Sequence, residues 1–105
     1  MPGASDSVLP KLNGLVSKAK LYSSDFAHVD FRVYQDDVHK GMYFIEVSKG
    51  RCSRKVLVNP RTAENLRQGF TGVILLREVR NALQFVATQS KELEAKAARI
   101  EARRR

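Results

Sequence analysis

The sequence predicts an α+β domain in which an N-terminal helix, a three-stranded antiparallel sheet and a long C-terminal helix follow one another (αβββα). Three observations predict this order. Apolar residues recur at helical spacing near the N-terminus, alternate with polar residues over 28–58, and return to helical spacing after residue 76. A chain of 105 residues suffices for one compact domain, which we expect to span 1–90, followed by a charged helical extension over 91–105.

The first helix is expected between Ser7 and Tyr22. Ser7 is a suitable N-cap residue, and Pro10 falls in the first turn, where proline is tolerated. The residues at three- and four-residue spacing form one apolar stripe, which consists of Val8, Leu12, Leu15, Val16 and Ala19.

The clearest strand signal is the strict alternation over 28–34. Further strands are expected over 42–47 and 51–58, and a turn at Lys49-Gly50 joins them into an antiparallel meander. In the first strand the alternation assigns Val29, Phe31 and Val33 to one face, and His28, Asp30, Arg32 and Tyr34 to the other.

The last helical region begins at Asn59-Pro60, because asparagine is a favoured N-cap and proline is favoured at the next position. Residues 73–76 fit either a fourth strand or the buried opening of a long helix, with Gly69 and Gly72 as interruptions before them. We favour the helix, because apolar positions continue from there in alternating steps of three and four. This seam can pack on the sheet up to about residue 86, and its predicted partner interface is Leu76, Val79, Leu83, Val86 and Leu93.

The charge is strongly basic and unevenly distributed. The net charge is +8 and the isoelectric point is about 10.1, which predicts a polyanionic partner. Residues 40–67 hold seven Lys or Arg against two Asp or Glu, and residues 91–105 hold six against three, whereas residues 1–39 hold four against five. The charge therefore concentrates in the second and third strands and at the C-terminus.

Catalytic constellations are not visible in the sequence. His28 and His39 have no cysteine or histidine at ligand spacing, and adjacent acids such as Asp36 and Asp37 usually initiate a turn. Cys52 is the single cysteine, and a half-buried structural role suits it better than that of a nucleophile. We therefore expect no enzyme activity, no metal site and no cofactor.

The compartment is expected to be intracellular, either cytoplasmic or nuclear. No segment approaches about eighteen uninterrupted apolar residues, so no membrane association is expected. The start of the chain lacks the pattern of a secretory signal, although its Ser and Lys content leaves an organellar address open. A single cysteine fits a reducing environment.

The candidate binding site is a nucleic-acid interface. Cations around the turn after the second strand can bind successive phosphates, and aromatic side chains on the first two strands can stack on unpaired bases. We expect the cations to converge at this turn. The predicted contacts are Arg32, Tyr34, Lys40, Lys49, Arg51, Arg54, Lys55 and Arg61, with Phe44 as a further stacking candidate.

Several short features between residues 8 and 80 occur in an order typical of one family of ribonucleoprotein subunits. They are the run 17–22, the strand end 32–34, the turn at Gly41, the turn 49–51, the strand end 56–58, and the apolar residues Leu66 and Phe70. In this order they resemble the small Alu-domain subunits of the signal recognition particle. The resemblance implies a homodimer or heterodimer with a related chain, a concave sheet face with basic residues against RNA, and no catalysis.

Other interpretations remain open beside an RNA-binding subunit of a ribonucleoprotein. Residues 40–47 resemble part of the PUR and whirly type of single-stranded nucleic-acid binder, which requires residues 73–76 to form a fourth strand. Double-stranded RNA-binding domains share the element order, but only Arg61 and Arg67 occupy the start of the second helix. A different class is a protein-interaction or assembly subunit that uses the C-terminal seam.

Overall fold

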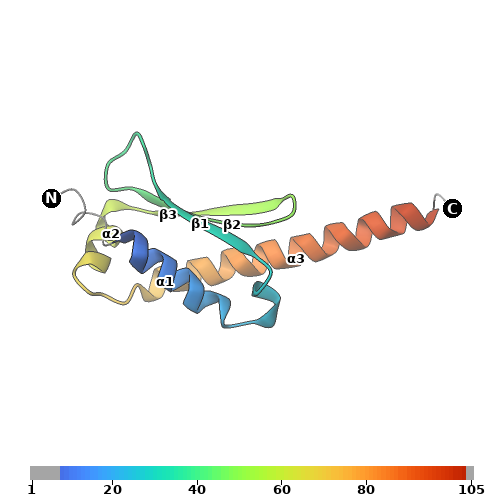
Figure 1. Ribbon diagram of the computed structural model, residues 1–105, viewed down its shortest axis with the longest axis horizontal. Helices are drawn as coiled ribbons and strands as arrows, with labels where there is room; N and C mark the ends of the chain where they lie inside the picture. The colour runs from blue at the N-terminus through green and yellow to red at the C-terminus, as the bar shows by residue number, and fades with distance from the viewer. Residues whose placement is uncertain (1–7, 104–105) are drawn as a thin grey trace.

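The computed structural model describes residues 8–103 and confirms the predicted α+β class (Figure 1). The predicted cap Ser7 lies outside the described residues. The described elements are helix α1 (Val8–Lys20), the short 3₁₀ helix η2 (Ser24–Phe26), strands β1 (Asp30–Gln35), β2 (Tyr43–Lys49) and β3 (Cys52–Val58), and helices α2 (Pro60–Arg67) and α3 (Val73–Arg103).

The sheet is an antiparallel meander in the order β1-β2-β3. Gly50 adopts a φ of 61° in the two-residue turn between β2 and β3, a conformation that glycine adopts without steric cost. Side chains of β2 alternate between buried and half-buried, with Tyr43, Ile45 and Val47 buried. Helices α1 and α3 cover this buried face, and the opposite face of the sheet carries no helix (Figure 1).

The core lies between the covered face of the sheet and the two longer helices. It contains the predicted stripe of α1, the buried row of β2 and the inward face of α3. The largest buried side chain is Tyr43, whose hydroxyl oxygen accepts a hydrogen bond from Nη2 of Arg67 at 3.2 Å. The buried polar end of this tyrosine is therefore satisfied.

Helices α2 and α3 are separate, and their boundary follows from local chemistry. The Asn59 side chain accepts a hydrogen bond from the backbone N–H of Thr62 at 2.8 Å, which confirms the predicted N-cap. Gly72 has a φ of 67°, and a Cβ there would lie 3.1 Å from Leu66 and 3.3 Å from Leu15. This glycine permits the turn between the two helices, and residues 73–76 then open α3 as predicted.

Burial along α3 divides the predicted seam into two parts. Val79, Leu83 and Val86 are fully buried in the chain's own core, and Leu76 packs against it. The prediction that these four residues bind a partner is therefore wrong: the covered face of the sheet requires an apolar helix, and α3 supplies it. Burial ends at Ser90, after which α3 projects past the sheet as an exposed rod (Figure 1). Only Leu93, 49% exposed, remains of the predicted interface.

Candidate nucleic-acid interface

The uncovered face of the sheet, which we call the open face, carries three cross-strand rows of side chains, of which two hold the candidate site and the third consists of Asp30, Ser48 and Ser53. Alternation along each strand directs these residues away from the helices. The strand register places Arg32, Glu46 and Lys55 in one row, and Tyr34, Phe44 and Leu57 in the next. The open face therefore pairs a charged row with an apolar, partly aromatic one.

Two aromatic rings form the centre of this face. Tyr34 and Phe44 stack with their ring centroids 5.6 Å apart and an angle of 27° between the ring planes. The guanidinium carbon of Arg32 lies 4.6 Å from the Tyr34 ring centroid, and Nζ of Lys55 lies 6.0 Å from that of Phe44. Each ring is therefore held beside a cation, within the range of a cation–π interaction.

Glu46 stands between the two cations. Its Oε1 atom accepts a hydrogen bond from Nη2 of Arg32 at 3.0 Å, and its register partner on the other side is Lys55. The row carries a formal charge of +1, because one carboxylate faces two cations. The Arg32 side chain is nonetheless 67% exposed. Its guanidinium therefore remains accessible to a phosphate.

The structure separates the other predicted cations instead of gathering them. Arg54 points to the helix-covered side, where its guanidinium carbon lies 4.3 Å from the Phe85 ring centroid. Lys49 and Arg51 line a groove between the β2–β3 turn and the extension of α3. The prediction of one converging cluster is therefore wrong, because adjacent residues of a strand point to opposite faces.

Lys40 and Arg61 lie at the other end of the sheet. Gly41 approaches Pro60 closely enough that an added Cβ would lie 3.4 Å from the proline Cβ, which brings the neighbouring residues of both segments together. Strand β3 separates this end from the β2–β3 turn by roughly 20 Å, at about 3.3 Å per residue. Cations therefore lie near both ends of the sheet.

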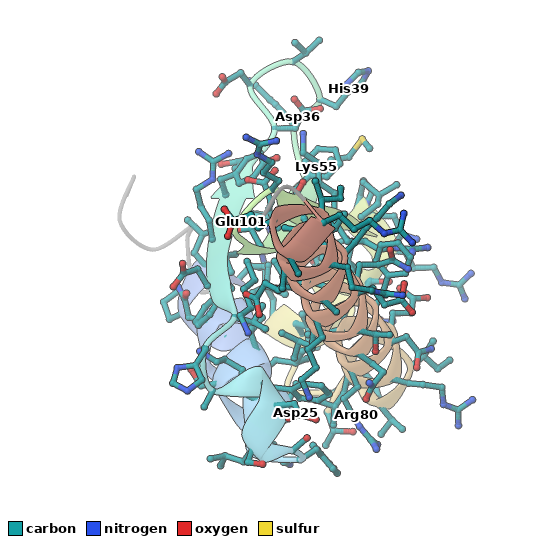
Figure 2. The ribbon with its side chains drawn as sticks, turned by 90° about the vertical axis from the view of Figure 1, so that its right-hand side faces the viewer. Asp25, Asp36, His39, Lys55, Arg80 and Glu101 are labelled. Atoms are coloured by element: carbon teal, nitrogen blue, oxygen red, sulfur yellow. The ribbon has the colours of Figure 1, made fainter. Side chains whose placement is uncertain are left out.

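Figure 2 views the molecule along its long axis, so that two opposite sides of it appear at the top and the bottom of the picture. Lys55 lies above α3, on the side of the loop that carries Asp36 and His39, whereas Asp25 and Arg80 lie on the opposite side. There the Arg80 guanidinium carbon lies 3.8 Å from the ring centroid of the exposed Tyr22. The sequence did not predict this further cation–aromatic pair, since nothing local joins residues so far apart in the chain.

Protein-family models, curated proteins and solved structures give no match to this chain. The resemblances to Alu-domain subunits and to PUR or whirly proteins stay predictions. Function is therefore inferred from the arrangement of the chain's own residues.

Side chains that could bind a metal ion do not gather in the described part of the chain. Within residues 8–103, no group of three or more His, Cys, Asp or Glu side chains is placed to hold a metal ion. Nδ1 of His39 lies 3.0 Å from Oδ2 of Asp36, and this hydrogen bond holds the pKa of the Asp36 carboxyl below its ordinary value. None of the helices in this same range is long and apolar enough to cross a membrane.

Proposed function

We propose that the chain is a non-catalytic RNA-binding protein that holds unpaired bases on the open face of its sheet. The observation that carries this proposal is the stacked pair of Tyr34 and Phe44 between Arg32 and Lys55. Aromatic side chains beside cations form a common platform for single-stranded nucleic acids, because bases stack on the rings while the cations bind phosphates.

The geometry favours unpaired bases over a duplex. Bases within a helix are already stacked on one another, so a ring on a protein surface can reach only bases that are splayed out. The aromatic rings of the open face lie on strands β1 and β2, and no helix of the described chain lies on this face to enter a groove. Loops, bulges and single-stranded segments are therefore the expected ligands.

The charge distribution supports moderate, salt-dependent affinity. Each phosphate that a cation neutralises adds about 0.7 to the slope of log affinity against log salt concentration for a single strand. Lys55 and Arg32 can supply such contacts on the face, and the cations near the two ends of the sheet can extend them. Glu46 opposes the same phosphates, which limits the contribution of the central row.

The test compares two adjacent charge reversals in strand β3. Lys55→Glu changes the open face, whereas Arg54→Glu changes the net charge equally on the helix-covered side. We expect Lys55→Glu to weaken binding to single-stranded RNA about tenfold and to lower the salt slope by about 0.7, with a smaller effect of Arg54→Glu. Fluorescence anisotropy with labelled single-stranded RNA, duplex RNA and duplex DNA across a salt series measures both quantities.

A third variant, Glu46→Gln, sharpens this test. It removes the carboxylate that pairs with Arg32 and faces Lys55, so affinity should rise above that of the wild-type chain. Equal losses for Lys55→Glu and Arg54→Glu, with no gain for Glu46→Gln, would show that only the net charge matters and would contradict binding on the open face.

A second candidate function is that of a protein-assembly subunit that forms a homodimer or heterodimer with a related chain. The observation that favours it is the exposed stripe of Leu93, Ala97 and Ile100 on the projecting part of α3. This stripe lines a groove of about 480 Å³ beside the β2–β3 turn. RNA binding on the open face leaves this groove free, so the two functions are compatible.

A further inference from the structure

Strand β3 forms a free edge of the sheet. A two-residue turn between antiparallel strands is closed by a hydrogen-bonded residue pair, here Lys49 and Cys52, and the bonded pairs then alternate along the ladder. By this alternation Ser53, Lys55 and Leu57 direct their backbone N–H and C=O groups away from β2. Within residues 8–103, none of the hydrogen bonds outside the ladders and helices involves a backbone group of β3.

The surface along this edge is hollowed and apolar. Two grooves of about 600 and 420 Å³ adjoin each other there and share Leu57 and Glu78 in their walls. The grooves run between β3 and the first half of α3, and the second extends to α2. Their exposed apolar side chains, each between 40% and 74% accessible, are Leu57, Phe70, Val73, Ile74 and Phe85.

Five large exposed apolar residues lie on one side of this small domain and indicate a binding site. Ten such residues are exposed among those described, and half of them line these two grooves. Exposed apolar groups gathered on one surface usually mark an interaction site. A free strand beside them offers unpaired main-chain donors and acceptors to a further strand.

The chemistry of this edge changes along its length. Phe70, Val73 and Ile74 line the end near the start of α3, whereas Arg54 and Lys55 line the middle of the strand. The cations outnumber Glu78, the acidic residue of the grooves. A ligand that matches this edge is therefore apolar at one end and acidic at the other.

A second copy of this chain does not match the edge. Antiparallel pairing of two β3 strands about a twofold axis through the strand centre would set Lys55 opposite the same lysine of the other copy. It would also set the apolar end against the polar turn end, near Ser53. Like charges directly opposite each other in a sheet are destabilising, and the apolar groove would stay empty.

We propose that the edge of β3 binds an extended segment of a different protein, which adds a fourth strand to the sheet. Main-chain hydrogen bonds to Ser53, Lys55 and Leu57 provide general affinity. Specificity comes from apolar side chains seated beside Phe70 and Ile74, and from acidic side chains placed near Arg54 and Lys55. This site lies at the edge of the sheet and shares Lys55 and Leu57 with the open face, whereas the aromatic rings of Tyr34 and Phe44 lie outside it.

The variant Ile74→Glu places a charge in the apolar part of the site and should leave the fold intact. Ile74 is 74% exposed and lies in the first turn of α3, where a carboxylate interacts favourably with the helix dipole. Val38→Glu is the matched control. Val38 is 80% exposed in the loop between β1 and β2, so the substitution introduces the same charge away from the proposed site. Both variants should retain the circular dichroism spectrum and the RNA affinity of the wild-type chain.

The probe is a display library of random peptides of about twelve residues, longer than a typical strand. Selection on the whole chain should enrich peptides with alternating apolar residues followed by Asp or Glu. The enriched peptides should bind the Val38→Glu chain equally well and the Ile74→Glu chain about tenfold more weakly. Absence of enrichment, apolar residues at helical spacing, or equal binding to both variants would overturn the proposal.

A second arm tests the backbone pairing and needs no protein variant. Methylation of alternate backbone nitrogens in a synthetic copy of an enriched peptide removes its main-chain donors but keeps its side chains. Strand addition predicts at least about tenfold weaker binding when the methylated nitrogens face β3, because two or three hydrogen bonds are lost. It predicts little change when the other set is methylated. Equal affinity of both methylated peptides would overturn the proposal.

Discussion

Replacement of Leu83 by alanine is expected to lower the free energy of unfolding by about 2–5 kcal/mol. Leu83 is fully buried in the core and lies near the middle of the packed part of α3. Its removal loses apolar burial and leaves a cavity that the sheet and helices can fill only in part. Urea denaturation followed by circular dichroism measures this loss.

The matched control is Leu93→Ala, three turns of the same helix closer to the C-terminus. Leu93 is about half exposed and lies beyond Ser90, where burial ends, so the expected loss is below about 1 kcal/mol. Similar large losses for both variants, together with dependence on protein concentration, would mean that the whole seam packs against a partner. That outcome would contradict the division of α3 into a core part and a projecting part.

Replacement of Phe44 by alanine is expected to weaken binding to single-stranded RNA by about 1–3 kcal/mol, or about 5- to 150-fold. Phe44 lies on the central strand, stacked on Tyr34 and beside Lys55. Loss of the ring removes the surface on which a base would stack. Isothermal titration calorimetry with a short single-stranded RNA measures the change.

Two further variants separate stacking from general effects of an aromatic deletion. Tyr22→Ala removes an exposed ring that also packs with an arginine, Arg80, but lies on the opposite side of the molecule. We expect it to bind RNA with wild-type affinity. Phe44→Leu keeps apolar volume and most of the sheet stability but offers no π-face. If Phe44→Leu binds as well as the wild-type chain, stacking does not contribute to affinity.

The sequence predicts the elements of this fold because the periodic spacing of apolar residues can be recognised without tertiary information. Alternation over 28–34 and 51–58 locates β1 and β3 within about two residues, and the Asn59-Pro60 signal locates the start of α2. Strand ends are less certain, because pairing with a neighbouring strand decides them. The separation of α2 from α3 depends on the positive φ of Gly72, which the sequence only suggests.

The role of the α3 seam was predicted only in part, because one pattern serves two purposes. Packing on the sheet up to about residue 86 was expected and agrees with the burial of Val79, Leu83 and Val86, whereas the partner interface expected at the same residues is wrong. Apolar residues at steps of three and four suit a helix that covers a sheet and a helix that pairs with another helix. Val79 and Leu93 follow the same rule, yet the first is buried and the second is half exposed. The length of the sheet determines the residue at which α3 stops being buried.

Part of the candidate site was predictable, and part required the structure. Arg32 and Tyr34 share the open face as the alternation of the first strand predicts. The same rule applied to the third strand would have separated Arg54 from Lys55, so this signal was present in the sequence. The pairing of Arg32 with Glu46 depends on the strand register, which the sequence does not reveal.

The most direct test of RNA binding on the open face is an NMR titration of the isotope-labelled chain with a short single-stranded RNA. We predict that the largest shift changes cluster at Arg32, Tyr34, Phe44 and Lys55, with smaller changes at the two ends of the sheet. Changes confined to the β2–β3 turn and the projecting part of α3, or no change at near-physiological salt, would contradict the proposed interface.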